Sequence, residues 1–198
     1  MKISAILILL ISITSLSAFK TISADDKYAV DTRRSVVEWK ATKVVGGHHG
    51  KLKLASGYLL VSGMELKGGS FTTDMNTITI EEMSGQSKQN LMNHLKSDDF
   101  FGVADNPTST FQITKVVPVD ADRVTITGNL TIKGITNPVS FAATIKYQNN
   151  NIIATAKGIK VDRTKYNIKY RSKSFFGDIG DKAIDDEFEL SVSLVARK

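Results

Sequence analysis

The chain has 198 residues, of which 41% are hydrophobic, and its 26 basic and 20 acidic side chains give a formal net charge of +6. This length fills one well-packed domain, and the positive excess is too mild to indicate a nucleic-acid-binding surface. The sequence contains no cysteine, which excludes a disulfide scaffold, a thiol enzyme and a lipoprotein acylated on cysteine.

The first segment is typical of a secretory signal peptide. One lysine precedes an apolar run over residues 3–16, and small residues follow. A membrane anchor is the alternative, but the run is shorter than the ~20 residues that a membrane span needs. We expect residues 1–24 to be the signal peptide, with cleavage between Ala18 and Ala24, and residues 25–198 to form one exported domain.

Alternating apolar and polar residues predict β-strands in the first half of this domain. Val37, Trp39 and Ala41 alternate with polar neighbours, which is the two-residue period of a strand. A turn is expected at Gly46 and Gly47. Leu52 and Leu54 then alternate with lysines, and strands are also expected in the β-branched and aromatic runs YLLVSG, GSFTTDMNTITI and STFQITKV.

The clearest alternation lies in the second half. Residues 124–132 carry apolar side chains at most even positions, and residues 139–147 carry them at odd positions. The segments Asn137-Pro138 and QNNN are expected to turn the chain after each of these strands. Residues 188–196 repeat the pattern, so each strand has one apolar and one polar face.

One segment breaks this rhythm. In SGQSKQNLMNHLKSDDFF, Leu91, Met92 and Leu95 fall at helical spacing, and Ser84 or Ser87 could cap the start. We therefore expect one short helix near residues 86–96.

The strand pattern favours an all-β fold that closes on itself. Antiparallel strands with one apolar face must cover that face, and about eight of them in an open sheet would leave costly edges. A single antiparallel barrel of about eight strands is the predicted architecture. A two-sheet sandwich is the alternative.

The residues that could carry chemistry do not form a recognisable catalytic set. His48 and His49 are adjacent, and neighbouring strand residues point to opposite faces, so they are poorly placed to share a metal ion. Asp98 and Asp99 follow the predicted helix and are interpreted as solvated loop residues. G-x-S-x-G, H-E-x-x-H and phosphate-loop motifs are absent from the sequence. We expect no catalytic residues, no metal site and no cofactor.

Two groups of side chains are candidates for ligand binding. The apolar strand faces would line a pocket, formed by Val37, Trp39, Leu130, Ile132, Val139, Phe141, Ala143, Ile145, Phe188, Leu190, Val192 and Leu194. A basic and aromatic rim could hold an anionic head group through Arg163, Lys165, Tyr166, Lys169, Tyr170 and Arg171. A solvated strand end and loop is the alternative interpretation of the second group.

Four segments in this order resemble the YceI-like family of periplasmic polyisoprenoid-binding proteins. They are YAVDTRRSVVEWKATK, LKSDDFFGVADNPTSTFQITKV, GNLTIKGITNPVSFAATI and DRTKYNIKY. The resemblance covers about residues 27–197. It implies a lipocalin-like barrel with a long apolar pocket for an isoprenoid or similar amphiphile, a periplasmic location, and no catalytic residue set.

We therefore expect a periplasmic binding or carrier protein for a long-chain isoprenoid or similar lipid. About eight strands enclose just enough room for side chains or one slender ligand. A ligand-free structural or stress-response module with a filled core is one alternative, and a small hydrolase or isomerase on the same barrel is another. Nucleic acid is not an expected partner, whereas a transient contact with the membrane or a membrane enzyme and a dimeric state are left open.

Overall fold

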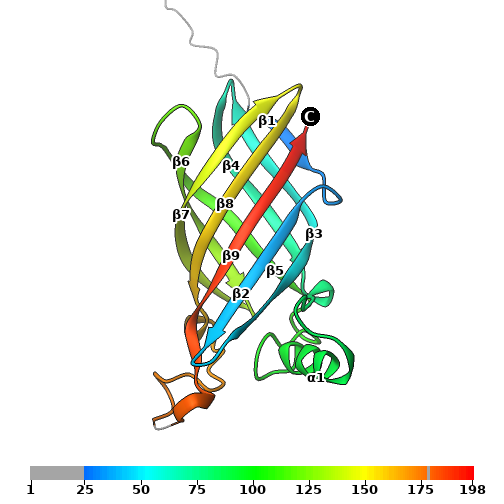
Figure 1. Ribbon diagram of the computed structural model, residues 1–198. Coiled ribbons are helices and arrows are strands. Elements are labelled where there is room, and N and C mark those ends of the chain that lie inside the picture. The colour runs from blue at the N-terminus through cyan, green and yellow to red at the C-terminus, as the bar shows by residue number, and fades with distance from the viewer. Residues whose placement is uncertain (1–24, 178) are drawn as a thin grey trace, which may run out of the picture.

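The computed structural model describes residues 25–177 and 179–198, and long antiparallel strands dominate it (Figure 1). The expected signal peptide, residues 1–24, lies outside the described residues. The strands are β1 (Asp26–Val30), β2 (Val36–Lys43), β3 (Gly47–Ser62), β4 (Glu65–Asp74), β5 (Thr108–Pro118), β6 (Arg123–Ile132), β7 (Ile135–Gln148), β8 (Asn151–Asp162) and β9 (Ile184–Arg197). The helices are α1 (Gly85–Lys96) and the 3₁₀ turns η1 (Met75–Thr77), η2 (Arg163–Tyr166) and η3 (Gly180–Lys182).

Eight strands form a closed ring. Each strand from β2 to β9 pairs with the next, and β9 pairs back with β2. The short β1 pairs with both β3 and β9 beyond the end of β2. It therefore occupies the same place in the barrel wall as β2, and residues 31–35 interrupt the strand between them. This arrangement confirms the predicted all-β antiparallel barrel and overturns the sandwich alternative. The predicted helix is confirmed as α1, which begins after Ser84.

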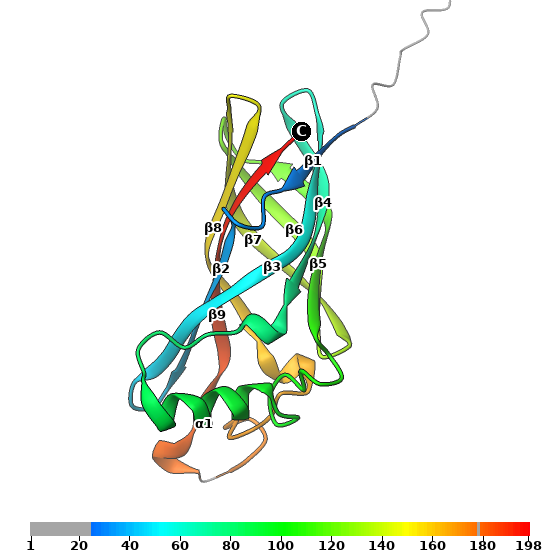
Figure 2. The ribbon, with the colours of Figure 1, turned by 90° about the vertical axis from the view of Figure 1, so that its right-hand side faces the viewer.

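The two ends of the barrel differ (Figures 1 and 2). The described N-terminus, the C-terminus and the β3–β4, β5–β6 and β7–β8 hairpins lie at one end, which we call the hairpin end. The other end carries α1, the β2–β3 and β6–β7 hairpins and an irregular segment formed by residues 163–177 and 179–183, and we call it the helical end. Within the described residues, no helix has the length and apolar character needed to cross a membrane.

The two-residue period places the apolar side chains inside the barrel. On β2, Val37 and Trp39 are buried, whereas Glu38 between them and Lys40 after them are exposed. The other strands repeat this alternation because successive side chains of a strand point to opposite faces of the sheet. The ring therefore has an apolar interior and a polar exterior.

One predicted strand ends early. The run GSFTTDMNTITI was expected to be extended throughout, but β4 ends at Asp74 and a 3₁₀ turn follows at Met75–Thr77. The Asp74 carboxylate accepts a hydrogen bond from the Asn76 amide at 2.9 Å, which caps that turn. Farther on, the Thr79 hydroxyl accepts from the Lys51 amide at 2.9 Å, so the segment still lies against β3 without joining its ladder.

The expected turn at Asn137-Pro138 is also wrong. The chain turns at Lys133-Gly134, whose φ angles of 54° and 73° suit a tight two-residue hairpin, and Pro138 lies within β7. A proline donates no backbone hydrogen bond and is tolerated where a strand has a free edge. Pro138 meets this condition because β7 pairs with β8 only over residues 144–148.

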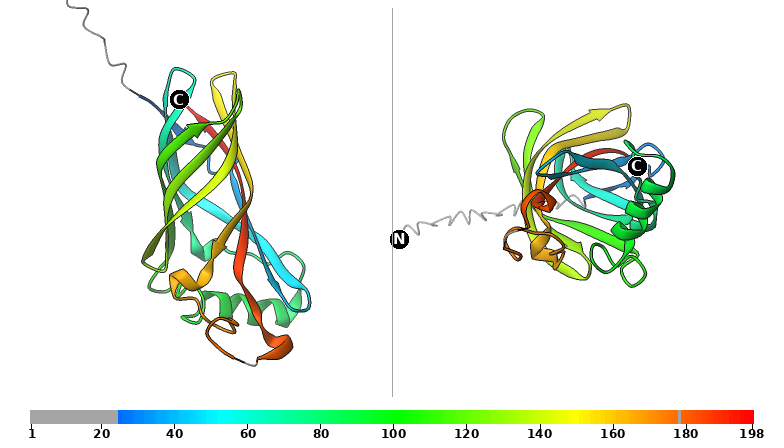
Figure 3. Two further views of the ribbon diagram at one scale, coloured as in Figure 1. Left: turned by 90° about the vertical axis from the view of Figure 1, so that its left-hand side faces the viewer. Right: turned by 60° about the horizontal axis from the view of Figure 1, so that its bottom comes forward.

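That free edge is part of a seam in the barrel wall. The β7–β8 ladder joins residues 144–148 to residues 151–155, although both strands continue toward the helical end. Figure 3 (left) shows this side of the barrel, where the two strands part. Among the described residues, one hydrogen bond crosses the seam, from Asn137 Nδ2 to the Lys165 carbonyl oxygen at 3.0 Å. The wall is therefore fully laddered near the hairpin end only.

Gly50 on β3 tests how the segment after η1 is held. Its missing Cβ would lie 1.8 Å from the Thr79 carbonyl oxygen and 3.0 Å from Trp39 Nε1, which donates to that same oxygen at 3.1 Å. We expect Gly50→Ala to displace this segment and to lower the free energy of unfolding by about 1–3 kcal/mol or more, as overpacking does. Chemical denaturation measures the loss.

Gly68→Ala on β4 is the matched control. A Cβ there would lie 3.7 Å from the Leu60 side chain, which is an ordinary contact, so stability should hold or rise slightly. Equal losses in the two variants would contradict the proposed clash with Thr79.

Candidate functional site

A cavity of about 180 Å³ lies inside the barrel. Its walls come from strands β2 to β9, and residues of the helical end close it from below. All twelve apolar residues that the sequence placed in a pocket line this cavity. Further lining residues on regular strands, such as Leu52 and Leu54, follow the same alternation.

Other lining residues lie outside the strand alternation. Leu95 lies in the last turn of α1, Phe100 and Phe101 follow the helix in a loop, and Ile168 lies in the irregular segment after β8. Sequence reasoning missed them as cavity residues because only the tertiary fold brings these segments over the end of the barrel.

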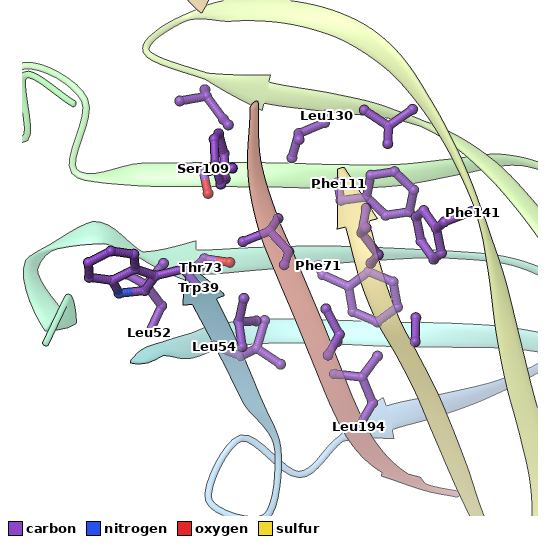
Figure 4. A pocket seen from close by; sticks show the side chains of 18 of the residues that line it. Trp39, Leu52, Leu54, Phe71, Thr73, Ser109, Phe111, Leu130, Phe141 and Leu194 are labelled. Atoms are coloured by element: carbon purple, nitrogen blue, oxygen red, sulfur yellow. The ribbon is translucent and has the colours of Figure 1, made fainter. Parts of the chain in front are cut away.

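The interior is hollow rather than filled. Phe71, Phe111, Phe141 and Leu190 line the cavity, yet each is only half-buried, so part of its surface faces free space inside the barrel. The three phenylalanines lie close together (Figure 4), and the rings of Phe111 and Phe141 are 5.5 Å apart at an interplanar angle of 42°. They narrow the middle of the cavity.

The Phe111 ring depends on a neighbouring glycine. A Cβ on Gly128 would lie 2.4 Å from Phe111 Cζ and 2.5 Å from the Gln112 carbonyl oxygen. Gly128 therefore leaves room for the ring against the barrel wall.

An aromatic cluster closes the helical end. The ring of His94 on α1 packs edge-on against Phe100 at 4.9 Å and against Tyr170 at 4.5 Å. His94 Nε2 also lies 3.0 Å from a carboxylate oxygen of Asp99. These contacts join α1 and its following loop to the irregular segment on the opposite side of the barrel opening.

The cavity has an apolar body and a polar end. Its polar lining residues are Thr73, Ser109, Thr155 and Arg163. Thr73 and Ser109 are ladder partners where β4 and β5 reach the helical end (Figure 4), and Arg163 begins η2 at the same end. Thr155 is the exception, because it lies on β8 opposite Thr144, where the β7–β8 ladder ends.

Arg163 does not belong to an exposed rim, contrary to expectation. It is 4% exposed, and its guanidinium donates to four backbone carbonyl oxygens, those of Asp185, Ile168, Tyr170 and Ile184, at 2.9–3.0 Å. Burial lowers its pKa, and nearby carboxylates, led by Asp186, oppose that shift. Since four of its five donors are already paired, Arg163 ties the irregular segment to β9 and is not free to hold a head group.

Tyr166 is also buried rather than at a rim. It is 1% exposed, and burial raises the pKa of its hydroxyl to about 12, so the side chain stays neutral at ordinary pH. The remaining four rim candidates lie at the surface of the helical end: Lys165 and Arg171 are exposed, and Lys169 and Tyr170 are half-buried.

The paired histidines meet a carboxylate. His48 Nδ1 and His49 Nδ1 lie 2.7 and 3.4 Å from the two carboxylate oxygens of Glu82, so both imidazoles reach one group even though they are adjacent on β3. Burial raises the pKa of Glu82, but hydrogen bonds from His48 and from backbone amides outweigh this and leave it below its ordinary value. Within residues 25–177 and 179–198, no cluster of three or more histidine, aspartate or glutamate side chains could hold a metal ion.

Comparison with protein families and curated proteins gives consistent results. The model of the YceI-like domain matches residues 28–196. A UPF0312 protein of Pseudomonas paraeruginosa is 36% identical over 91 residues, which are 42% of this chain and 47% of the relative. A UPF0312 protein of Pectobacterium atrosepticum is 33% identical over 106 residues, which are 53% of either chain. The chain thus spans about half the length of the curated relatives that it matches.

Solved structures share the barrel. Burkholderia cenocepacia BcnA superposes with a TM-score of 0.68 at 19% identity, covering 84% of this chain and 99% of BcnA. A polyisoprenoid binding domain from Saccharophagus degradans, implicated in plant cell wall breakdown, gives 0.65 at 13% identity, covering 86% of this chain and 97% of that domain. At these identities the likeness concerns the fold alone.

Arg163→Met tests the tie at the helical end. The substitution leaves one buried and three part-buried carbonyl oxygens without their donor. A buried acceptor without a partner costs about 1–3 kcal/mol, and water that reaches the part-buried oxygens lowers that cost. We expect a lower free energy of unfolding and faster amide hydrogen exchange in residues 163–185. Lys165→Met, at an exposed neighbour, should change stability by no more than about 0.5 kcal/mol. Unchanged exchange in Arg163→Met would contradict this role.

Proposed function

This chain belongs to the YceI-like family, and from that premise we propose that it is an exported, periplasmic binding or carrier protein for a long-chain isoprenoid or similar amphiphilic lipid. The observation that carries the proposal is the hollow apolar cavity, whose polar lining lies mainly at one end. The signal-peptide pattern of residues 1–24 supports export.

The lining suits a hydrocarbon chain. Each buried methylene contributes about 0.8 kcal/mol of transfer free energy, so a few isoprene units offer a large gross gain without polar contacts. A polar head would lie toward the helical end, near the hydroxyls of Thr73 and Ser109, with Lys165, Lys169 and Arg171 on the adjoining surface. These three cations would favour an anionic head group.

The size of the cavity favours a slender ligand. Its volume is close to the ~150 Å³ of an apolar cavity that accepts one benzene ring, and it is below the ~300–1,000 Å³ of most small-molecule sites. A long chain therefore requires the rings of Phe71, Phe111 and Phe141 to rotate away from the middle of the barrel. A rigid fused-ring ligand would need a larger displacement of the wall.

Binding is favoured over catalysis by the chemistry of the lining. Arg163 is the one charged residue among the described lining residues, and its donors are engaged by backbone carbonyls. No histidine, carboxylate or lysine of the described chain lines the cavity, so no base is placed to activate the hydroxyls of Thr73, Ser109 or Thr155. A structural neighbour is described as a polyisoprenoid binding domain, which supports the proposed ligand class.

Mass spectrometry of an organic extract of the purified protein tests the ligand class. We expect a long-chain isoprenoid or related lipid to co-purify at a substantial fraction of one molecule per chain. Extracts that contain no lipid, from protein that also fails to bind an added polyprenyl phosphate, would refute the proposal.

Ala143→Trp tests whether the cavity holds the ligand. Ala143 is buried and lines the cavity, so an indole there occupies the path of a long chain. We expect lipid binding to weaken at least tenfold. Because the barrel is hollow, the lipid-free protein should lose less than the about 1–3 kcal/mol that overpacking a filled core costs.

Ala142→Trp is the matched control, since Ala142 is the exposed neighbour on the outer face of β7. It should bind lipid as the parent protein does. Stability is compared on delipidated samples, because bound ligand itself raises stability. Equal lipid binding by Ala143→Trp and Ala142→Trp would place the ligand outside the cavity.

A further inference from the structure

The helical end exposes a group of large apolar side chains. Val44 and Val45 in the β2–β3 hairpin are 45% and 71% exposed, and Phe175 and Phe176 in the irregular segment are 50% and 48% exposed. Side chains of this kind are rarely exposed in clusters unless they contact a partner.

Backbone hydrogen bonds place both segments beside the start of β9. The Val44 amide donates to the Ala183 carbonyl oxygen at 3.4 Å, and the Ile184 amide donates to the Arg171 carbonyl oxygen at 2.9 Å. The amides of Phe175 and Phe176 both donate to the Ser172 carbonyl oxygen, and Ser172 bridges to Ile184. The two valines and the two phenylalanines therefore flank the same short stretch of chain, and we call them the apolar tip.

The segment that carries Phe175 and Phe176 is rich in cations. Residues 165–182 contain five basic and two acidic residues, a net charge of +3. In the part of the chain that the structure describes, none of the five cations forms an ion pair. Lys169 Nζ lies 4.5 Å from the centre of the Phe175 ring, so charge and aromatic surface are directly adjacent.

Two of the three carboxylates at the start of β9 pair with cations outside the apolar tip. Asp185 accepts from the Thr42 hydroxyl at 2.5 Å, and Asp186 lies 3.7 Å from the buried Arg163 guanidinium. Glu187 pairs with Lys160 at 3.3 Å on the outer wall of the barrel. Asp185 keeps its negative charge because the Thr42 hydroxyl is neutral, so residues 165–182 together with Asp185 carry a net charge of +3 − 1 = +2.

We propose that the apolar tip and its cations dock on the surface of an anionic phospholipid bilayer. Aromatic and aliphatic side chains ringed by lysine and arginine are typical of interfacial membrane contacts, in which the apolar groups enter the headgroup region and the cations attract anionic lipids. Charge complementarity selects the anionic bilayer as the occupant. The inference goes beyond the proposed function and depends on surface residues that do not line the cavity.

Docking at this face would also orient the barrel. The polar lining of Thr73 and Ser109 lies at the helical end, so the polar end of the cavity would face the lipid surface. The long axis of the barrel would then point away from the membrane.

Vesicle co-sedimentation of the delipidated, exported chain tests the proposal. Vesicles of phosphatidylglycerol mixed with phosphatidylcholine should bind the protein at least tenfold more tightly than vesicles of phosphatidylcholine alone. Binding should weaken as ionic strength rises, because salt screens exposed charges. Equal partition into the two kinds of vesicle, or no binding to either, would overturn the proposal, and an acidic protein partner would then be sought.

Two sets of variants separate the contributions. Phe175→Ser with Phe176→Ser should lower binding to the anionic vesicles at least tenfold. Met64→Ser with Val119→Ser is the matched control at the hairpin end, where these side chains are 76% and 58% exposed, and it should bind as the parent does. Equal losses in the two double variants would overturn the assignment of the face.

A triple variant tests the cations. Replacing Lys169, Arg171 and Lys173 with Gln should remove most of the preference for anionic vesicles, since each basic residue near an anionic surface strengthens partition about fivefold. A preference that survives this change would overturn the electrostatic part of the proposal.

The docking proposal and the proposed lipid binding can be tested independently. Ala143→Trp should bind anionic vesicles as the parent protein does while it fails to take up lipid. Lipid uptake without vesicle binding in the parent would refute the docking face alone, and vesicle binding without any lipid uptake would refute the proposed function alone.

Discussion

Closure of the backbone ladder is the constraint on which the rest of the structure depends. Once β9 returns to β2, each strand has two neighbours, and the inner face of every strand is removed from bulk water. The alternating pattern then fixes which face of each strand points inward, because a one-residue shift of register would place a full set of polar side chains in the interior. The apolar cavity lies inside this closed ring, where small lining residues such as Ala143 and Ala154 leave space that larger side chains could fill.

The irregular segment at the helical end is held differently, because it belongs to no strand. In residues 163–177 and 179–183 the backbone is largely irregular, and the buried Arg163 guanidinium donates to four carbonyl oxygens in this segment and at the start of β9 that would otherwise lack donors. The contacts of His94 with Phe100 and Tyr170 add an apolar link to α1. One charged side chain and one aromatic cluster thus stabilise the irregular segment, whereas backbone hydrogen bonds between strands stabilise the barrel wall.

Local pattern explains what the sequence could predict. Alternation is a property of neighbouring residues, so residues such as Val37 and Phe141 could be assigned to the inner face, and the spacing of Leu91 and Leu95 located α1. The turn at Lys133-Gly134 was missed because the nearby Asn137-Pro138 carries a stronger turn signal. Pro138 nevertheless fits within β7, because this part of the strand has a free edge on the side of β8. The prediction for Arg163 was wrong because the carbonyl groups of its partners come together around it only in the tertiary structure; they belong to Ile168, Tyr170, Ile184 and Asp185.

The seam between β7 and β8 gives the barrel an uneven stiffness. Near the hairpin end, any increase in circumference must break ladder hydrogen bonds between residues 144–148 and 151–155. Toward the helical end, one hydrogen bond, from the Asn137 side chain to the Lys165 carbonyl oxygen, crosses the seam within the described residues, so widening the barrel there breaks fewer hydrogen bonds. A barrel that is rigid at the hairpin end and more easily widened at the helical end can adapt its diameter to a ligand without losing its fold.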